Sequence, residues 1–570
     1  MKTPRRALRA FSWMPLVAIA LSACVGQPER LWVKAPGWSR AQLIAETRVQ
    51  DPVPIALDDK GNIYIFSFSS TADATHPRLT ALDRAANTLW DRTYERVSVS
   101  GPRQPKLLWD GRKLQLFWIG DETLYRATAD ASGALSEPTS ISDELLVDSF
   151  DVSIDSRDVV ATWFAGPVED PGLYSLDPGG FETEPTLVDP EGVQPDIQFD
   201  QEGTLHAIWS QDSPEPGPIP IFYGAYPGGR YQPGKEQVLA SPHVAGTASF
   251  RGPKLGLDSE LAYVFWSTTQ YSGLEAGRVE AEYVYFPKGD PSSSTQVQTL
   301  RVPYAFTLAY VDSDGALEAG PRVALESSEE MDGTQIIEIA PNGGYSDELA
   351  IALHARLGYP MRKTRPQVSA LYFEGGAPNS YQQLSFTPAS SSSPSILSDR
   401  DGQLYLTWLE RGDEAGWGVY FASTADDLGA ALRGLDLGDV GRLAAETTFG
   451  LLSGGLLIPI GLIWSVPAMI ALALTGRLRR SEDGIAGIGG LLSLALALVL
   501  LWAIKLGVLP AIQTYVPFSA WIPVIPVGWD ELLRVGVPVL IAAAGFLAAW
   551  VDLSRRGEDS PYRLVAVYAV

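Results

Sequence analysis

The residue types best suited to chemistry are spread along the chain without a catalytic or metal-binding pattern. The four histidines, His76, His206, His243 and His354, lack the spacing that a zinc site needs. The sequence contains no Gly-x-Ser-x-Gly elbow, no phosphate-binding loop and no dinucleotide fingerprint. Acidic residues are so numerous that no two carboxylates stand out as a glycosidase pair. We therefore predict no catalytic residue, no metal site and no cofactor.

Acidic turns offer a second kind of chemistry, because carboxylate oxygens can bind Ca²⁺. Examples are Asp58-Asp59, Asp312-x-Asp314-Gly and Asp399-x-Asp401-Gly. None continues into a complete calcium loop that ends in a bidentate acid. We interpret these acids as turn residues, because Asp and Gly tolerate the backbone angles of tight turns between strands.

These turns belong to a sequence repeat. An Asp is followed eight or nine residues later by an aromatic residue in the pairs Asp58/Phe66, Asp110/Trp118, Asp155/Trp163, Asp200/Trp209, Asp258/Trp266 and Asp399/Trp408. A proline often stands five residues before the Asp, as at Pro105, Pro195, Pro253 and Pro394. A seventh, degenerate copy around Asp347 keeps the apolar strand and lacks the aromatic residue. Each copy reads as a strand, a turn and a second strand.

The spacing of the repeats predicts an all-β propeller over residues 45–424. Further strands at 220–226, 279–286 and 417–423 complete small sheets, and four-stranded units of about 40–50 residues are typical of propeller blades. A single such sheet cannot bury both faces, whereas sheets packed in a ring cover one another. We predict seven blades with an insertion between Asp258 and Asp347; eight or six blades remain alternatives. The residues predicted to fill the spaces between blades are Trp118, Trp163, Trp209, Trp266 and Trp408.

The clearest copy of the repeat, Pro394–Trp408, carries a resemblance to a known family. Its pattern, P-x-I-x-x-D-x-x-G-x-L-Y-x-x-W, looks like the repeats of sialidase-like propellers in exported bacterial proteins. The resemblance covers most of residues 50–424 and implies that fold. Sialidase activity would also require an Asp-box, three convergent arginines and a Tyr/Glu nucleophile pair. The segment nearest to an Asp-box, residues 398–405, precedes an inner strand, so the resemblance assigns no catalytic residue.

The first residues predict export. Basic residues near the start are followed by an apolar stretch from Phe11 to Ala20 and then by Leu21-Ser22-Ala23-Cys24. This arrangement is typical of a signal peptide over residues 1–23, and its last four residues resemble the lipobox of bacterial lipoproteins. Cys24, the only cysteine, is therefore the predicted lipid attachment site; the alternative is an ordinary cleavage site. Residues 24–44 form the predicted linker to the propeller.

The last residues predict a membrane domain. A helical connector over 425–446 leads into residues 447–570, which contain three apolar stretches at about 449–475, 485–509 and 532–551. Arginines follow the first and the third stretch, at Arg477, Arg479, Arg480, Arg555 and Arg556. The positive-inside rule places these arginines in the cytoplasm. We therefore expect a small α-helical transmembrane bundle in the bacterial cytoplasmic membrane, with the propeller outside and the C-terminus inside.

Charge limits the partners. The chain carries a net charge of −24; the leader to Ala23 contributes +4 and the residues from Gly450 onward +1, which leaves −29 for the body. Such a body repels nucleic acid, so we expect no nucleic-acid partner. The preferred hypothesis is a membrane-anchored binding or scaffold module with a protein or glycan ligand. The alternatives are an exported sialidase-like glycoside hydrolase and a sensor or assembly subunit of a membrane complex.

Overall fold

The structure, a computed structural model, describes most of the predicted body and small parts of the tail. The described residues are 37–302, 323–324, 335–428 and parts of 466–555, apart from gaps at 72–73, 143, 212–216, 245–247, 272–276, 343–347, 358–364, 386–388, 413–415 and 426–427. The chain divides into two compact units. One comprises Trp32–Thr307 and Glu318–Gly434, and the other comprises Met1–Leu31, Leu308–Leu317 and Leu435–Val570.

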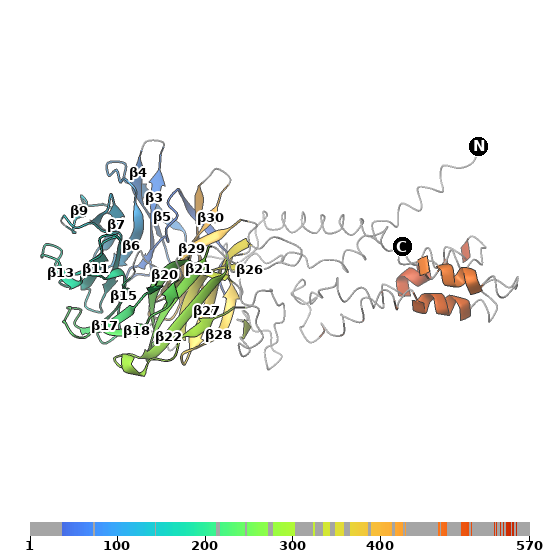
Figure 1. Cartoon of the computed structure of the whole chain (residues 1–570). Coiled ribbons are helices and arrows are strands. Elements are labelled where there is room, and N and C mark those ends of the chain that lie inside the picture. Colours follow the sequence, from blue (N-terminus) through green and yellow to red (C-terminus); the bar gives the residue numbers. More distant parts are fainter. Residues whose placement is uncertain are drawn as a thin grey trace. The chain divides into compact units, whose positions relative to one another are not determined.

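The first unit is a ring of seven antiparallel sheets, so the prediction of a seven-bladed propeller is confirmed (Figure 1). Blade 1 contains β2 (Ile55–Leu57), β3 (Ile63–Ser70), β4 (Thr75–Leu82) and β5 (Thr88–Thr93). Blade 2 contains β6 (Arg103–Trp109), β7 (Leu114–Gly120), β8 (Thr123–Ala129) and β9 (Thr139–Ser140). Blade 3 contains β10 (Ser149–Ile154), β11 (Val160–Ala165), β12 (Leu173–Leu176) and β13 (Thr186–Asp189).

The next blades keep this order and carry the insertions. Blade 4 contains β14 (Val193–Phe199), β15 (Thr204–Ser210), β17 (Ile221–Pro227) and β18 (Gln237–Ala240); a small separate sheet pairs β16 (Gly217–Pro218) with β19 (His243–Val244). Blade 5 contains β20 (Ala248–Leu257), β21 (Leu261–Gln270), β22 (Val279–Pro287) and β23 (Gln298–Leu300), with the short helix η1 (Pro291–Ser293) before β23. Blade 6 contains β25 (Gln335–Pro341), β26 (Glu348–Leu357), β27 (Arg365–Glu374), β28 (Ala377–Gln383) and β24 (Val323–Ala324) as a fifth strand.

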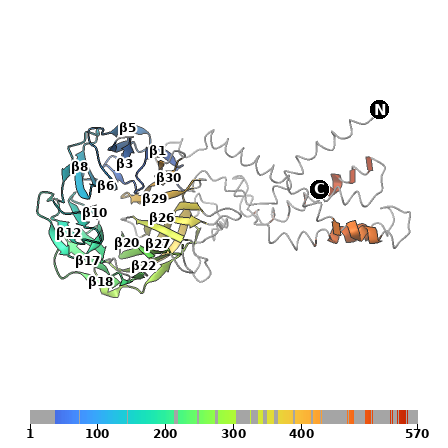
Figure 2. The ribbon, with the colours of Figure 1, turned by 45° about the horizontal axis from the view of Figure 1, so that its top comes forward.

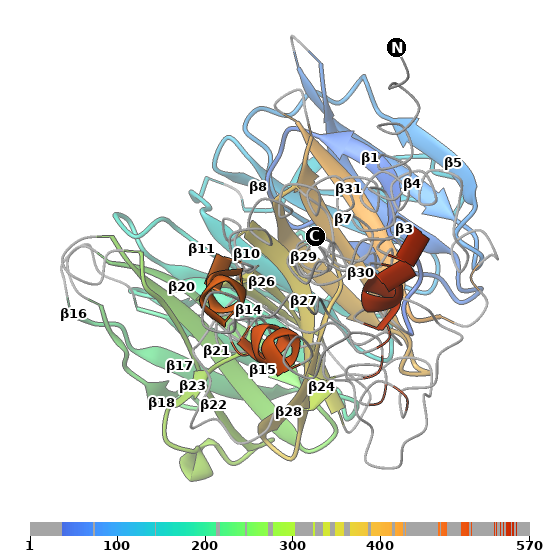
Figure 3. The same cartoon turned by 90° about the vertical axis from the view of Figure 1, so that its right-hand side faces the viewer.

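Blade 7 combines both ends of the propeller sequence. It contains β29 (Ser391–Ser398), β30 (Leu404–Arg411) and β31 (Trp417–Ser423), and its outermost strand is β1 (Gln42–Thr47) (Figure 3). Ser39 and Ser423 continue this pairing, because the Ser39 N–H donates to the Ser423 carbonyl at 2.7 Å and the Ser423 N–H donates to Ser39 Oγ at 3.0 Å. The predicted boundary at residue 45 therefore falls inside β1. This pairing closes the ring and covers an edge strand that would otherwise be exposed.

In blades 1 to 5 the first strand lies nearest the propeller axis and the last lies at the rim, as Figure 2 shows for β6, β10 and β20 against β5 and β18; in blades 6 and 7, β25 and β29 take the inner position and β24 and β1 the outer one. The second strand lies between neighbours and is buried along most of its length; all seven residues of β7 are buried. Strands that are buried on both faces are largely apolar, and LQLFWIG in β7 has one polar side chain, Gln115, which hydrogen-bonds to Asp110 and Arg126. The hydrophobic core is therefore divided into clusters between adjacent blades.

The repeated Asp closes the hairpin between the first and second strands. In Asp399, Oδ1 accepts the N–H groups of Asp401 and Gln403, both at 2.9 Å, and Oδ2 accepts the Tyr405 hydroxyl at 3.2 Å. Asp58 and Asp258 bind the equivalent groups in their own turns. The carboxylates at these positions thus hold the turn, as the sequence predicts. Within the described residues, no three His, Cys, Asp or Glu side chains are grouped to hold a metal ion.

All five predicted interblade tryptophans are at most 1% exposed and lie in clusters shared by two blades. Their directions differ. Trp209 follows a turn closed by an Asp200 N–H to Thr204 carbonyl bond, and it faces the preceding blade. The Asp155 turn has the same length, but Trp163 comes eight residues after its Asp instead of nine. Successive residues of a strand point to opposite faces, so Trp163 faces the following blade and meets Trp209 there.

The second unit is described only in part. Helix covers residues 466–467, 469–475 and 492–500, with shorter helical pieces up to residue 555. Among the helices described here, none combines the length and apolar character that crossing a membrane demands. The predicted spans lie only partly within the described residues, and Cys24, most of the connector and the acidic turn at Asp312–Gly315 lie outside them. The membrane domain and the lipid site therefore stay predictions.

Candidate functional site

The first strands of four blades begin with the same irregularity. A residue with positive φ precedes a proline, and the strand pairing shifts there: the residues are Gln104, Gln194, Gly252 and Ser393, with φ of 50°, 53°, 112° and 50°. This is a β-bulge, which bends the strand and redirects its side chains. The prolines are those that precede the repeated Asp in the sequence. We call the end of the propeller where the first strands begin the mouth face, and the opposite end, with the Asp turns, the turn face.

The residues just after the bulges occupy one register around the axis. Lys106, Asp196 and Lys254 pair with the second-strand residues that directly precede Trp118, Trp209 and Trp266. Asp151 in blade 3 and Glu338 in blade 6 have the corresponding partners Trp163 and His354. Five neighbouring blades therefore place one charged side chain each at the same level of the first strand.

Two lysines form ion pairs with acids of this ring of charged side chains. Lys106 Nζ lies 2.5 Å from Asp151 Oδ1, and Lys254 Nζ lies 2.6 Å from Asp196 Oδ2. The remaining oxygens accept backbone N–H groups of the following blade, from Ile197 to Asp151 at 2.8 Å and from Leu255 to Asp196 at 3.4 Å. Burial alone would lower the pKa of Lys254, but the charges of Asp196 and Asp151 outweigh it and raise that pKa above its ordinary value. The ring thus joins blades 2 to 5.

Polar contacts continue around the whole mouth face. Blade 2 meets blades 1 and 3 through Gln104 N–H to Asp51 Oδ2 at 2.7 Å and Arg103 Nη1 to Asp148 Oδ1 at 2.7 Å. Blades 3 and 4 meet through Gln194 N–H to Ser149 Oγ at 3.2 Å. Every one of the seven junctions between blades is bridged in this way. We call these residues the polar belt: Gln50, Asp51, Arg103, Gln104, Lys106, Asp148, Ser149, Asp151, Gln194, Asp196, Arg251, Lys254, Glu338 and Ser393.

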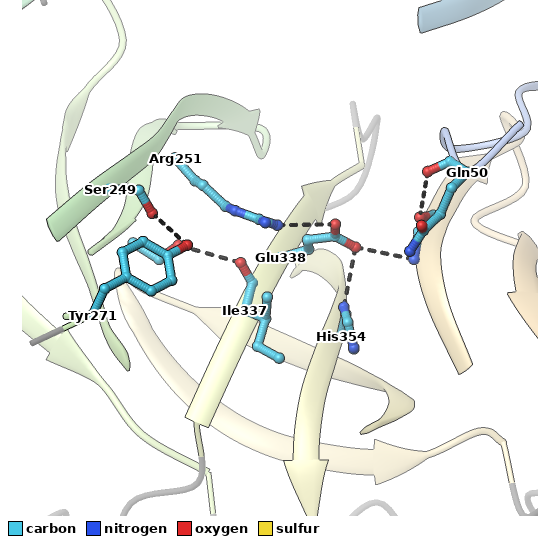
Figure 4. Close-up of polar contacts among 9 residues, drawn as sticks. Gln50, Ser249, Arg251, Tyr271, Ile337, Glu338 and His354 are labelled. Atoms are coloured by element: carbon cyan, nitrogen blue, oxygen red, sulfur yellow. Dashed lines mark hydrogen bonds and ion pairs between the residues drawn. The ribbon is translucent and has the colours of Figure 1, made fainter. Parts of the chain in front are cut away.

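Glu338 is the most connected acid of the polar belt (Figure 4). Its Oε1 lies 3.2 Å from Arg251 Nη1 of blade 5, and its Oε2 accepts the Ser393 N–H of blade 7 at 3.0 Å. Ser393 Oγ in turn donates to the Gln50 carbonyl at 3.1 Å, which joins blade 7 to the segment entering blade 1. Glu338 therefore links blade 6 to blades 5 and 7, and its partner Ser393 extends these contacts to the segment that enters blade 1.

His354 of the neighbouring strand β26 orients the Glu338 carboxylate. Its Nδ1 lies 3.2 Å from Glu338 Oε2, and since a carboxylate only accepts hydrogen bonds, Nδ1 is the donor. Burial raises the pKa of Glu338, but the His354 hydrogen bond, together with the Ser393 N–H and Arg251, lowers it below its ordinary value. His354 is 8% exposed, and its Nε2 is buried without a hydrogen-bond partner among the described residues.

An exposed aromatic residue lies beside this cluster. Tyr271 directly follows β21 and is 62% exposed, whereas Tyr263 and Tyr283 of the same blade are buried. The Tyr271 hydroxyl lies 3.1 Å from Ser249 Oγ, and Figure 4 shows this hydroxyl edge of the ring turned toward Ser249. Ser249 and Arg251 are two residues apart on β20 and thus share one face of the strand. A held aromatic ring, a guanidinium and a carboxylate are therefore grouped on the mouth face at blades 5 and 6.

Three of the four histidines considered in the sequence lie away from the polar belt. His76 contacts the Val97 carbonyl, His206 lies between Tyr223 and Asp200, and His243 is exposed on β19. Of the four histidines, His354 is the one in contact with the polar belt. Sequence reasoning missed Arg251, Glu338 and Tyr271. The available signal was the residue after each bulge proline, which is charged at Lys106, Asp196 and Lys254.

Comparisons with known proteins assign no family to this chain. No family model matches the chain, and no curated protein matches it. Among solved structures, an ulvan lyase of polysaccharide lyase family PL25 is 10% identical, with 71% of this chain and 99% of that chain covered and a TM-score of 0.45. An α-L-arabinanase from Penicillium chrysogenum is 10% identical, with 69% and 97% covered and a TM-score of 0.33. A sialidase from Trypanosoma rangeli is 9% identical, with 66% and 54% covered and a TM-score of 0.30. At these values we transfer neither activity nor ligand.

Proposed function

We propose that the protein is a binding or scaffold module whose ligand docks on the mouth face at blades 5 and 6. The observation that carries this proposal is that the acids of the polar belt bind groups of neighbouring blades. Asp151, Asp196 and Glu338 each have both oxygens bound by groups of neighbouring blades. These contacts hold the ring together and preorganise the mouth face, and preorganised surfaces lose less entropy when they bind a ligand.

The hydrolase hypothesis has weaker support. A glycosidase needs one carboxylate free to attack or to activate water, and a second one placed to donate a proton. In the polar belt the acids are occupied by structural contacts. The two arginines of the polar belt, Arg103 and Arg251, are each paired with an acid, Asp148 and Glu338. The sialidase resemblance would require three convergent arginines beside a Tyr/Glu pair, and the polar belt offers a different set.

We further propose that the module is exported and held at the outer face of the bacterial cytoplasmic membrane. The supporting observations are the leader with Cys24, the three apolar stretches after residue 447 and the arginines that follow two of them. A role as sensor or assembly subunit is an extension of this proposal, since a membrane domain could pass on the occupancy of the propeller.

The experiment is capture by the purified full-length chain from a mixed panel of oligosaccharides and of exported proteins, followed by analysis of the captured material for cleavage. We expect the wild-type chain to retain a ligand without cleaving it, as Glu338→Gln also should if it still binds the ligand. Time-dependent cleavage by the wild-type chain that disappears in Glu338→Gln would replace the binding proposal with the hydrolase.

A further inference from the structure

We propose that the ligand is an uncharged saccharide, whose ring stacks on Tyr271 and whose hydroxyl groups bind the Arg251–Glu338 pair. This inference rests on the proposed binding function and adds the chemical class of the ligand. It is carried by the aromatic ring bound to Ser249, by the pair of Glu338 with Arg251, which lies on the same strand face as Ser249, and by the charge of the surrounding polar belt.

Tyr271 supplies the apolar contact. A pyranose ring has a face of C–H groups that packs on an aromatic ring, as apolar surface leaves water. Tyr271 is 62% exposed, yet its hydroxyl is held by Ser249 Oγ at 3.1 Å. The ring is therefore available to a ligand and restrained before the ligand arrives, which lowers the entropy lost on binding.

Arg251 and Glu338 supply a donor and an acceptor side by side. The Arg251 side chain is 48% exposed, and one of its nitrogens lies 3.2 Å from Glu338 Oε1. The guanidinium has five N–H donors, and a carboxylate oxygen has more than one acceptor site. A hydroxyl group both donates and accepts, so two neighbouring hydroxyls of a sugar match the pair without displacing it. His354 and the Ser393 N–H keep the carboxylate oriented.

Charge argues against an acidic sugar. The polar belt contains five acids and four bases; the acids are Asp51, Asp148, Asp151, Asp196 and Glu338, and the bases are Arg103, Lys106, Arg251 and Lys254. The four bases are each paired with one of these acids within 3.2 Å. A carboxylate on the ligand would have to compete for Arg251 with Glu338 and would be repelled by the acidic body. An uncharged ligand meets neither cost.

The test is titration of the purified full-length chain with neutral disaccharides (maltose, cellobiose and lactose) and with acidic counterparts (sialyllactose and a glucuronate disaccharide), at low and high salt. We expect a neutral sugar to bind with little salt dependence. Tyr271→Ala should weaken that binding by roughly tenfold or more, and Tyr271→Phe, which keeps the ring, by about threefold or less. Leu187→Ala, a change at an exposed residue of the rim strand β13, is the matched control and should leave binding unchanged.

Three results would overturn the inference. They are binding of the acidic sugars alone, equal binding by Tyr271→Ala with an unchanged melting temperature, and no binding of any sugar. If the full-length chain then captures a protein on the mouth face, the binding function stands and only the saccharide class falls.

Discussion

Trp163 of blade 3 packs against Trp209 of blade 4, with ring centroids 5.9 Å apart and an angle of 46° between the rings. Tyr226 lies 5.5 Å from the same Trp163 ring, and all three side chains are at most 1% exposed. The aromatic residues of the repeat also pack together between blades 1 and 2, where the ring centroids of Phe66 and Trp118 are 6.0 Å apart. Each of these two interfaces between blades therefore contains two aromatic residues of the repeat.

The first prediction concerns this pair. Trp209→Ala should lower the free energy of unfolding by about 3–5 kcal/mol, because it leaves a cavity between two blades. The double variant with Trp163→Ala should be less harmful than the sum of the single variants by about 0.5–1.5 kcal/mol, since one contact is lost in both. Denaturant unfolding followed by tryptophan fluorescence measures these values. A loss below about 1 kcal/mol for Trp209→Ala would mean that the interblade contact contributes little.

The second prediction concerns ring closure. Removing residues 37–47 deletes β1 and leaves β31 as an exposed edge strand, which should cause aggregation or a lower melting temperature. Trp38→Ala is a milder form of the same change. Trp38 is 3% exposed, and its Nε1 donates to Gln382 Oε1 of blade 6 at 3.0 Å. A monomer of unchanged stability after the deletion would show that β1 is dispensable for closure.

The third prediction concerns pH and Glu338. Because contacts in the folded state lower the pKa of Glu338, its ionised form contributes stability that is complete above the unfolded-state pKa of about 4.3 and is lost as pH falls through the lower folded-state pKa. At neutral pH, Glu338→Gln should cost about 1–3 kcal/mol. The variant should also lose part of the decline in stability that the wild-type chain shows below that unfolded-state pKa.

Unfolding curves measured from neutral pH down to acid check this prediction. The matched control is Glu202→Gln, an exposed position in the Asp200 turn, which should follow the wild-type curve. If Glu338→Gln and the wild-type chain lose stability in parallel over the acidic range, Glu338 does not bind the blades together as an ionised group.

The fold and the number of blades could be predicted from the sequence, but the direction in which each aromatic residue points could not. The Asp turn and the aromatic residue recur because each blade needs the same hairpin and the same filling of its face, so the blade number could be counted. The direction of each aromatic residue depends on turn length together with spacing. Trp163 and Trp209 show this, since both turns close over the same number of residues while the tryptophans differ by one position.

The strand β1 and the residues of the candidate site could not be predicted, because no repeated sequence pattern marks them. β1 carries no Asp turn, and its pairing with β31 joins residues from opposite ends of the propeller, so it resembled a linker in sequence. Glu338 lies in the degenerate blade 6, where neither the bulge proline nor the aromatic residue marks the register. Tyr271 follows the end of β21, and its contact with Ser249 depends on how β20 and β21 pair. Contacts that join distant residues at the mouth face emerge only from the folded ring.

The fourth prediction concerns the proposed membrane attachment. Cys24→Ala should abolish lipid labelling and leave the chain in the membrane fraction, because three apolar spans hold a protein far more strongly than one lipid anchor. Removal of residues 447–570 should leave a form held by the lipid alone, and only the double change should release the propeller. A protease added outside should spare a tag placed after Val570; digestion of that tag would contradict the proposed orientation.

The central claim, that a ligand docks on the mouth face at blades 5 and 6, is tested most directly by comparing two arginines. Arg251 pairs with Glu338 at 3.2 Å on the mouth face, and Arg230 pairs with Asp177 at the same distance on the turn face. Ligand capture by the full-length chain should fall roughly tenfold or more in Arg251→Gln and stay at the wild-type level in Arg230→Gln. Equal capture by the two variants, with both folded as judged by their melting temperatures, would contradict the assignment of the binding site.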